Sequence, residues 1–496
     1  MQKELKELSI KASLSLMGQI IGQILSCILV VLISRCLGAA VYGEYLYVYT
    51  FVSFFTILAK LGMENAIVYY ISRNNIEHDE KEKIVQFILE AAATVGITLV
   101  CIMYFAKDWI AETLLNNINY SQILLLLLPL IVLEAISALF FSILKGKKWI
   151  FELTVAKNII GTGVSIIFLF IMYYLLQIRN VFSIIIPQYV GGILAILYCI
   201  YQINKKEKRT ALIHVHLDLD KCKEVMRYSL PLVLMNVVVL INHNADKYMI
   251  GYLMDSSNVA IYTVAIYISQ FSSFALTAVN NIFAPLISEL YASDKIEELD
   301  MLYKKATRWV MIINLAIFSM AINFPYEIMR LAGNDFETGG IVLIIVMLGQ
   351  IVNSGVGAVG SLNSMTGHTK INLFTSVIAV IINLGLNFLF IKPYGMIGAA
   401  VASAISLALT NLINLWFVYK NVKVFPYTKR YIGVGLAFFL ATLFVHVYAD
   451  LVSYHFFIKL LIGGVLFVFL YFTFVYLWGL DSEEKEIIKK IRGRRV

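Results

Sequence analysis

The chain is short of charge and of proline. Only 15% of its 496 residues are Asp, Glu, Lys or Arg, whereas 60% are hydrophobic and the mean hydropathy is +0.80. A soluble domain is about one quarter charged, because its surface has to be solvated. Seven prolines and 29 glycines also exclude a collagen-like or low-complexity chain. The composition therefore predicts an integral membrane protein.

Motifs for catalysis and metal binding are missing as well. There is no GxxxxGK[ST] loop for ATP, no Ser-centred elbow and no HExxH zinc motif. The pair His214 and His216 lies in a basic loop without nearby cysteine, which is typical of solvated surface. The odd number of cysteines and their wide spacing predict free thiols at Cys27, Cys36, Cys101, Cys199 and Cys222. We therefore predict no catalytic residue, no bound metal and no cofactor.

Long apolar runs are what the chain has instead. Each is near the length of about 20 residues that a spanning helix needs, and none alternates as a barrel strand would. The runs cover residues 12–34, 43–71, 84–106, 121–144, 152–176, 181–202, 228–252, 258–287, 307–325, 341–364, 371–391, 395–419, 430–448 and 455–478. We expect an all-α integral membrane protein with about 14 transmembrane helices.

The basic residues predict the orientation. Of the 40 Lys and Arg, 31 lie on the side of the N-terminus, four lie inside spans, and five lie on the other side, at Arg35, Lys107, Arg179, Arg330 and Lys392. Basic loops stay in the cytoplasm, so both termini are expected there. The first run is too long for a signal peptide and lacks a cleavage site, so it should remain in the protein. The net charge of +8 then reflects topology and anionic lipid headgroups, and we expect no nucleic-acid partner.

A weak internal repeat divides the chain. Three short matches, which open spans one and two and follow span four, recur later at offsets of 216, 217 and 221 residues. We predict an N-terminal lobe of six helices (1–203), a basic linker (204–227), a C-terminal lobe of six helices (228–425), two extra helices (426–480) and a basic tail (481–496). Parallel repeats of this kind usually bind substrate between the halves.

Lys60 and Glu64 place opposite charges within the second span. Four residues apart, they would stack on one face of a continuous helix. Ionisable groups inside spans are expensive and by default suggest function. The two form either a self-neutralising ion pair or one wall of a polar cavity. We favour the cavity, because a purely structural pair could be replaced by apolar residues at no loss.

Glu134 lies near the middle of the fourth span. It either pairs with Lys157, at comparable depth on the next span, or binds a coupling proton or sodium ion. We favour the pairing and retain Glu134 as the coupling-ion candidate.

The seventh span ends in a polar stretch, VVVLINHNADKYMIGYL. Counting about 1.5 Å per residue from Arg227 places Asp246 and Lys247 in the outer part of the span. Asn242 and Asp246, four apart, share a face. The stretch is either a polar face at the outer half of a cavity, with Lys60 its counterpart on the inner half, or an interfacial helix end whose lysine snorkels. Span eight adds the pair Asn280 and Asn281.

The segment from Ser34 to Tyr45 reads SRCLGAAVYGEY and is similar to the R-x-LG-x-x-x-YG-x-Y signature of the family of polysaccharide flippases of the Wzx type. This family shares a superfamily with lipid II flippases and MATE drug exporters. Asp246-Lys247 followed by Ile261-Tyr262 looks like its entry into span eight, and FAPLISEL after residue 282 looks like the exit. The most specific match runs from Gly367 through Asn383 and Asn387 to YGMIGAAVA. The resemblance covers nearly the full length.

The resemblance implies a two-lobed, V-shaped transporter that works by alternating access. Its cargo would be an oligosaccharide repeat unit on a polyprenyl diphosphate, exported for surface polysaccharide. The anionic diphosphate needs cations, for which Arg35, Lys60 and Lys247 are the candidates. The sugars need hydrogen-bonding partners, for which the candidates are Asn65, Asn242, Asn244, Asn280 and Asn281. Glu64 and Asp246 stand beside the lysines and complete the candidate substrate site.

Three alternatives stay open. A MATE-like cation-coupled exporter wants an acidic cavity, whereas here lysines stand beside the carboxylates. A lipid II flippase is poorly separated by sequence. A membrane polysaccharide polymerase or ligase usually carries a large external loop, and the outer loops here are short. We expect a monomer in a bacterial plasma membrane, with membrane lipids and polysaccharide assembly proteins as candidate partners and with sodium, protons or membrane potential as the driving force.

Overall fold

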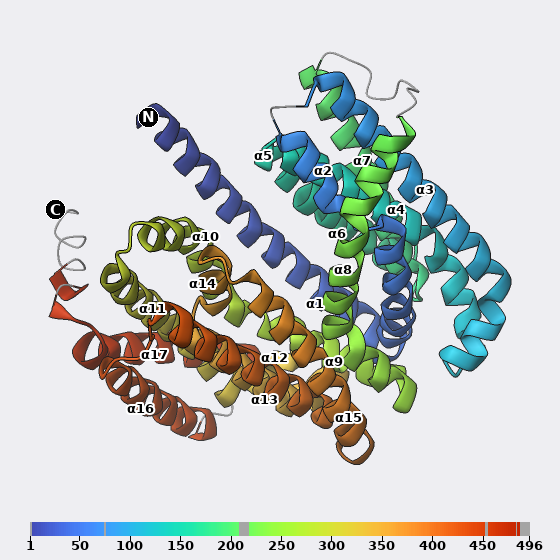
Figure 1. Ribbon diagram of the computed structural model, residues 1–496. Helices are drawn as coiled ribbons and strands as arrows, with labels where there is room; N and C mark the ends of the chain where they lie inside the picture. The colour runs from blue at the N-terminus through green and yellow to red at the C-terminus, as the bar shows by residue number, and fades with distance from the viewer. Residues whose placement is uncertain (1, 74–75, 208–217, 452–454, 483, 487–496) are drawn as a thin grey trace. The chain divides into compact units, whose positions relative to one another are not determined.

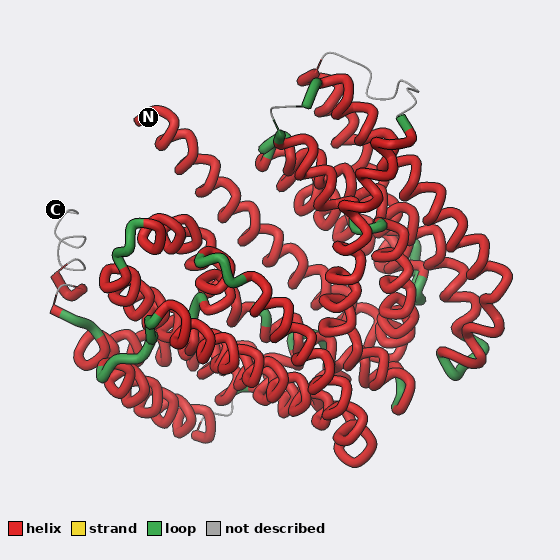
Figure 2. Tube along the Cα trace, in the orientation of Figure 1, coloured by secondary structure: helices red, strands yellow, loops and turns green. Residues whose placement is uncertain are grey.

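The protein is built from helices. The computed structural model describes residues 2–73, 76–207, 218–451, 455–482 and 484–486. Over these residues the elements are helices joined by short connections, and no strand is formed (Figure 2). A membrane imposes this, because backbone groups in the hydrocarbon core have to be satisfied within the same segment.

The chain divides into two compact units, residues 1–260 and 261–496. The chain passes from one to the other within α9 (Ser256–Ser269). The first unit contains α1 (Gln2–Lys60), α2 (Met63–Ser72), α3 (His78–Trp109), α4 (Tyr120–Gly146), α5 (Ile150–Thr154), α6 (Val164–Phe170), α7 (Phe182–Glu207) and α8 (Leu219–Leu253), with π-helical segments η1 (Ile110–Leu114), η2 (Val155–Gly163) and η3 (Ile171–Leu175). Figure 1 labels the α-helices.

The second unit holds the remaining helices. They are α10 (Phe271–Ala292), α11 (Ile296–Asn323), α12 (Pro325–Arg330), α13 (Gly340–Val356), α14 (Val359–Met365), α15 (Thr369–Val422), α16 (Arg430–Leu451) and α17 (Phe456–Phe474), with the 3₁₀ segment η4 (Asn334–Gly339) and the π segment η5 (Val475–Gly479).

Twelve helical stretches in the described part of the chain are long and apolar enough to cross a membrane. Two of them, Ile20–Ser72 and Thr369–Val422, contain 53 and 54 residues, which is about 80 Å of helix. The hydrocarbon core is only about 30 Å thick, so each of these stretches has the length of two spans. Both contain a glycine with non-helical torsion angles, Gly38 (φ 74°) and Gly395 (φ 60°), where α1 and α15 bend. Counting these two as double brings the total to the expected number of about 14.

The bend in α15 is followed by closely packed small residues. A Cβ on Gly398 would meet the backbone of Phe390 on the preceding half of the same helix. Ala399, Ala400 and Ala402 are fully buried beside it. Only side chains of this size let the two halves of the helix approach so closely.

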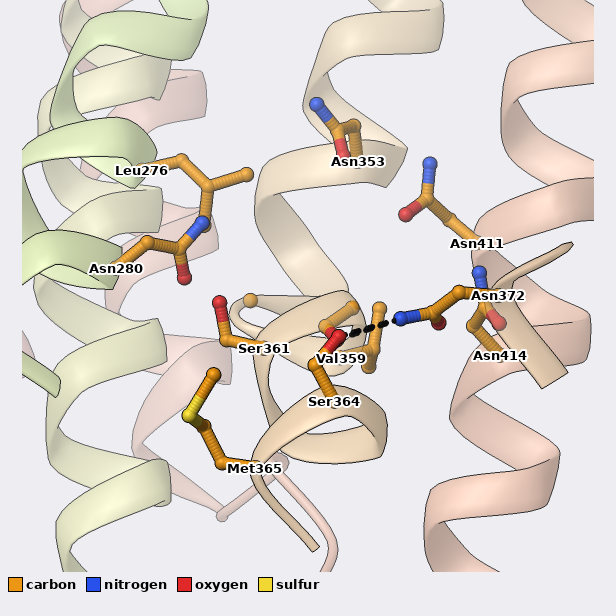
Figure 3. Close-up of a pocket in the computed structure, with 12 residues that line it drawn as sticks. Leu276, Asn280, Asn353, Val359, Ser361, Ser364, Met365, Asn372, Asn411 and Asn414 are labelled. Atoms are coloured by element: carbon orange, nitrogen blue, oxygen red, sulfur yellow. Dashed lines mark hydrogen bonds between the residues drawn. The ribbon is translucent and has the colours of Figure 1, made fainter. Parts of the chain in front are cut away.

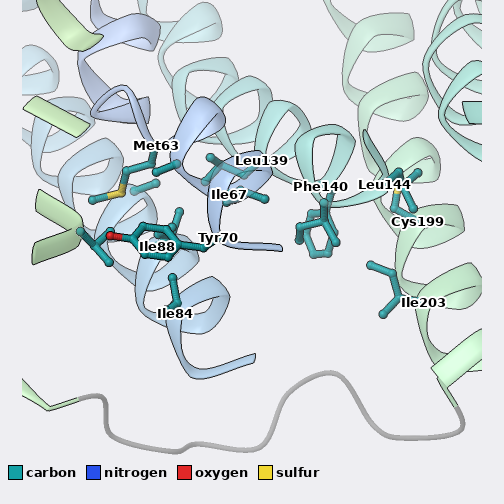
Figure 4. Close-up of a cluster of buried hydrophobic side chains, with 14 of the residues drawn as sticks. Met63, Ile67, Tyr70, Ile84, Ile88, Leu139, Phe140, Leu144, Cys199 and Ile203 are labelled. Carbon is teal, nitrogen blue, oxygen red and sulfur yellow. The ribbon is translucent and has the colours of Figure 1, made fainter. Parts of the chain in front are cut away.

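The core of the first unit lies where α2, α3, α4 and α7 meet (Figure 4). Its members are aliphatic and aromatic side chains with little or no exposed surface, among them Met63, Ile67, Ile88, Leu139 and Phe140. Dense packing of this kind holds α2 in place although α2 is only ten residues long.

The two extra helices form a core of their own with α11. Phe324, Phe467 and Tyr471 are buried there, and the Tyr471 hydroxyl donates to the backbone oxygen of Ile312 at 3.1 Å. The predicted tail begins with residues that also belong to this region. Asp481 and Glu484 contact Arg308 of α11, as described below, while residues 487–496 of the tail lie outside the described residues.

The division between the units falls later than the predicted linker. Residues 208–217 of that linker are not described, whereas residues 204–207 continue α7 and residues 219–227 begin α8. The helix α8 packs against α1, α2 and α3 and belongs to the first unit. The division of the chain into two six-helix lobes that move separately stays a prediction.

Candidate functional site

The second predicted span is broken in the middle. The helix α1 ends at Lys60, Leu61 and Gly62 have positive φ angles of 51° and 68°, and α2 begins at Met63. A helix end leaves backbone carbonyls or N–H groups without intrahelical partners, so the break adds polar backbone to an apolar stretch. Inside a membrane protein, such backbone is tolerated where it is buried in protein or lines a polar cavity.

Lys60 and Glu64 face each other across this break. The Lys60 ammonium lies 2.8 Å from the Glu64 carboxylate, and the side chains are 19% and 26% exposed. The lysine occupies the last turn of α1 and the glutamate the first turn of α2. Each charge therefore also interacts favourably with the dipole of its own helix. The ion pair, the alternative to the favoured cavity wall, is therefore formed, but across two helix ends rather than along one helix. That the pair also lines a polar cavity stays a prediction.

A neighbouring helix packs directly on the break. A Cβ placed on Gly62 would lie 2.6 Å from the backbone oxygen of Ser229 and 2.9 Å from the backbone nitrogen of Val233, both in α8. Between these two residues stands Pro231, which lacks an N–H and so frees a carbonyl one turn earlier. Polar backbone from both helices is thus gathered beside the Lys60–Glu64 pair.

Glu134 joins this region from α4. The hydroxyl of Tyr49 donates to Glu134 Oε1 at 2.8 Å, and the charge of Lys60 is near enough to act on the carboxylate. The predicted pairing with Lys157 is wrong: the Lys157 side chain is exposed, and neither residue contributes to an ion pair with the other. Equal depth on neighbouring helices did not bring the two together, because η2 turns Lys157 outward while α4 turns Glu134 toward α1.

A row of stacked tyrosines on α1 leads to Tyr49, which contacts the Glu134 carboxylate. The rings of Tyr45 and Tyr49 stack with centroids 5.5 Å apart, and Tyr42 stacks on Tyr45 at 6.2 Å. Gln188 of α7 donates to the Tyr45 hydroxyl at 2.5 Å. The carboxylate is therefore set in a hydrogen-bonded group of neutral polar side chains with one cation, Lys60, close by.

Lys247 and Asp246 lie at the other end of α8. From Val233, beside the helix break, to Lys247 is about 21 Å along the helix axis. The Tyr248 hydroxyl donates to the backbone oxygen of Leu114 at 2.8 Å, at the end of the third span. Asp246 is buried, whereas Lys247 is half-buried and donates to Asn244 Oδ1 at 2.9 Å. Lys60 and Lys247 thus stand at two different depths of the first unit.

The other candidates in the first unit are exposed side chains. Arg35 precedes the bend at Gly38, Asn65 lies in the first turn of α2, and Asn242 lies one turn before Asp246. The expected shared face of Asn242 and Asp246 therefore runs from an exposed residue to a buried one. An exposed cluster of His78, Asp79 and Glu82 opens α3, and its acids suit a helix N-terminus.

The second unit contains Asn280 and Asn281 and a polar pocket. Asn281 is exposed, whereas Asn280 borders a pocket of about 400 Å³ among α10, α13, α14 and α15 (Figure 3). Its polar lining is made of neutral side chains, namely Asn280, Asn353, Ser361, Ser364, Asn372, Asn411 and Asn414. Except for Asn280, sequence reasoning missed these residues. Asn411 and Asn414, three apart in an apolar run, were the signal that could have revealed them.

A second break in a span shapes this pocket. The helix α13 ends at Val356, Gly357 has φ 69° and ψ −142°, and α14 begins at Val359. The Tyr303 hydroxyl of α11 donates to the freed backbone oxygen of Val356. The family-signature residues Asn383 and Asn387 lie elsewhere, in a hydrogen-bonded group with Ser403 and Tyr262.

A family model of polysaccharide biosynthesis proteins matches residues 10–291, more than half of the chain. The chain belongs to this family. The match includes Arg35, Lys60, Glu134 and Lys247, and a second family model, MatE, matches residues 231–389. Membership confirms the resemblance that the signature segments indicated.

Two individual relatives match this chain over shorter stretches, and a third matches nearly its full length. The capsular polysaccharide biosynthesis protein CapF of Staphylococcus aureus is 23% identical over 212 residues, 42% of this chain and 53% of CapF. The probable low-salt glycan biosynthesis flippase Agl15 of Haloferax volcanii is 25% identical over 37% of this chain and 39% of its own length. The chain therefore spans about half or less of these two relatives. An uncharacterized membrane protein of Methanocaldococcus jannaschii is 21% identical over 91% of this chain and 92% of its own length.

Solved structures confirm the fold class. The inward closed conformation of the lipid II flippase MurJ superposes with a TM-score of 0.76 and 19% identity, covering 93% of this chain and 97% of that one. An inward-facing multidrug resistance transporter of the MATE family gives 0.68 and 16%, covering 83% and 98%. The fold of this family member is thus that of the MOP superfamily transporters.

Proposed function

We propose that this family member is a flippase that moves oligosaccharides linked to a polyprenyl diphosphate across the plasma membrane. One observation carries the proposal: a chain of the polysaccharide biosynthesis family holds a lysine inside a broken span. The relatives that support it are named as a capsular polysaccharide biosynthesis protein, a probable low-salt glycan biosynthesis flippase and a probable flippase. The protein acts as a transporter, without covalent chemistry on its cargo.

The chemistry of the site fits such a cargo. A diphosphate entering an apolar protein needs a cation that holds it without trapping it, since a fully desolvated ion pair would not release. Lys60 is already balanced by Glu64, so binding exchanges one anionic partner for another. Lys247, about 21 Å along α8 from Val233 at the helix break, offers the diphosphate a second position as it crosses. The sugars bind to asparagines and tyrosines.

Glu134 is the proposed coupling site. Its carboxylate is held by Tyr49 close to Lys60, so the charge of a proton or sodium ion bound there would act on the diphosphate site. The membrane potential is the alternative driving force. Both termini are placed in the cytoplasm of a bacterial cell, and the protein is proposed to act as a monomer with polysaccharide assembly proteins nearby.

A lipid II flippase is the second candidate function. The match to MurJ over 93% of this chain is the observation that favours it. Both functions move a polyprenyl diphosphate, so Lys60 and Lys247 would serve in the same way.

Deletion of the gene followed by analysis of lipid-linked sugars tests the proposal. We expect polyprenyl-diphosphate repeat units to accumulate on the cytoplasmic side and surface polysaccharide to be lost. Accumulation of lipid II instead would favour the second candidate. If both pools and the surface polysaccharide stayed unchanged, the flippase function would be wrong.

A further inference from the structure

We infer that the asparagine-lined pocket of the second unit is a binding site for a neutral saccharide, formed by that unit alone. The inference rests on the proposed function and deepens it, because it assigns part of the cargo's glycan to a separate place. The pocket volume, about 400 Å³, lies in the range of pockets that hold small organic ligands. It has room for a small saccharide.

The lining excludes the charged part of the cargo. Asn280, Asn353, Asn372, Asn411 and Asn414 are neutral, and no Lys, Arg, Asp or Glu is among the residues that line the pocket. A diphosphate would find no counter-charge there, and a divalent cation would find no carboxylate. Amides and hydroxyls both donate and accept hydrogen bonds, which is what the hydroxyl and N-acetyl groups of a sugar require.

Part of the hydrogen-bonding capacity of the lining is already used. Asn372 donates to Ser364 Oγ at 2.8 Å and to the backbone oxygen of Gly360 at 2.9 Å. Asn414 Oδ1 accepts from Thr375 at 3.1 Å and from Asn363 at 3.3 Å. These bonds hold the two side chains in place, so the wall of the pocket is preorganised.

Other groups are left for a ligand. Asn280 Oδ1 is buried without a hydrogen-bond partner among the described residues. Asn411 donates its amide to the backbone oxygen of Leu407 at 2.9 Å, which leaves its own oxygen for an incoming donor. Figure 3 shows Asn280 and Asn411 entering the pocket from opposite helices, with Leu276, Val359 and Met365 supplying apolar surface for the carbon face of a sugar ring.

The position along the helices suits a loading site. Asn372 lies two residues after Lys370, and Asn414 lies six residues before Lys420, about 9 Å along the helix. The pocket is therefore in the half of the unit nearer to the basic loops. With those loops in the cytoplasm, a glycan assembled there meets this pocket at the start of its crossing.

Saturation-transfer NMR on the purified full-length protein in detergent tests the site, with the methyl glycosides of glucose, galactose and N-acetylglucosamine as probes. We expect a signal from at least one glycoside with the wild type. Asn280→Leu and Asn411→Leu should each weaken that binding about tenfold, the effect of losing about one well-placed hydrogen bond. Asn421→Leu is the matched control, because Asn421 stands on the same helix as Asn411 but outside the pocket.

The thermal midpoint of each variant shows whether it folds, and Ser361→Ala, which removes only a hydroxyl, replaces any variant that does not. No signal with the wild type, or equal signals in the pocket variants, would overturn the inference. So would displacement of the glycoside by sodium chloride but not by choline chloride, which would assign the pocket to a cation. If export depends on the protein while no glycoside binds, the inferred saccharide site is wrong and the proposed function stands. If the pocket variants lose glycoside binding while export does not depend on the protein, the saccharide site stands and the proposed function is wrong.

Discussion

The surroundings of the Lys60–Glu64 pair indicate that its role is functional and not only structural. A half-buried ion pair adds little stability, because the cost of desolvation consumes most of the Coulomb attraction. The second unit holds a matched pair, Lys459 and Glu327, at 3.0 Å with 21% and 19% exposure. It differs in position, because Glu327 follows the end of the span Ile296–Asn323 and Lys459 lies near the start of the span Phe456–Gly479, whereas Lys60 and Glu64 lie inside a span. A functional role should therefore distinguish Lys60 from Lys459.

Replacing Lys60 by alanine is expected to lower export of lipid-linked oligosaccharide about tenfold or more, the effect of losing a hydrogen bond to a charged group. Lys60→Arg should retain most activity, and the double variant with Lys247→Ala should be lower still. Export is measured in a deletion strain with protein level determined by immunoblot. Lys459→Ala is the control. Equal loss from Lys60→Ala and Lys459→Ala, or unchanged export in the double variant, would make these lysines structural.

Arg308 is a buried residue whose role is structural. Only 3% exposed, it donates to Asp481 at 2.8 Å and to Glu484 at 2.6 Å, and the Trp309 indole also donates to Glu484, at 3.1 Å. Arg430 adds a contact with Asp481 at 2.8 Å. The cluster joins the residues after the last span to α11 and α16. Removal of Glu484 takes one carboxylate partner away from the buried guanidinium of Arg308. Glu484→Ala should therefore destabilise the protein by about 3 to 5 kcal/mol.

The Asp481 contact predicts a pH dependence. The hydrogen bond from Arg308 lowers the pKa of Asp481 below its ordinary value. The folded state then holds its proton more weakly than the unfolded state, so the stabilisation is complete above a pH of about 4 and is lost as the pH falls through the folded pKa. The melting temperature of the wild type should exceed that of Asp481→Asn from pH 7 to about 4, and the difference should shrink below that. A difference that grows on acidification would contradict this assignment.

At the scale of the element, two breaks organise the spans. The helices stop at Lys60 and at Val356, in stretches apolar enough to continue, and each break brings polar groups into a span. In the first unit these are Lys60 and Glu64, and in the second they are Asn353, Ser361 and Ser364 of the pocket. Packing supports each break: α8 approaches Gly62, and Tyr303 satisfies the oxygen of Val356. Tertiary contacts therefore compensate for the lost helical hydrogen bonds.

Gly62→Ala should destabilise the protein by about 1 to 3 kcal/mol, because a Cβ at φ 68° is strained and would also collide with the backbone of Ser229. Thermal unfolding in detergent measures it. The control is Gly435→Ala in α16, where a Cβ meets nothing within 4 Å and alanine favours the helix. An unchanged midpoint for Gly62→Ala would mean that α8 does not hold the break in this way.

At the scale of the whole molecule, the distribution of basic residues predicts topology. A reporter fused after Asn119, which precedes α4, or after Gly333, which precedes η4, is expected on the outer side of the membrane. The comparison is a fusion after Lys145 or Lys370, expected in the cytoplasm. A cytoplasmic signal from either of the first two positions would invert the orientation, and with it the assignment of the asparagine pocket to the loading side.

The sequence by itself determined that the chain is an all-helical membrane protein, approximately how many spans it has, and to which family it belongs. These follow from composition, run length and local signatures, which need no knowledge of contacts. Only the tertiary structure decided that the second span breaks at Leu61–Gly62, that Glu134 faces Tyr49 instead of Lys157, and that five asparagines from three helices share one pocket. The rotation of one helix against the next sets these contacts. That rotation arises from packing among residues far apart in the chain, so it cannot be predicted from the sequence of any single apolar run.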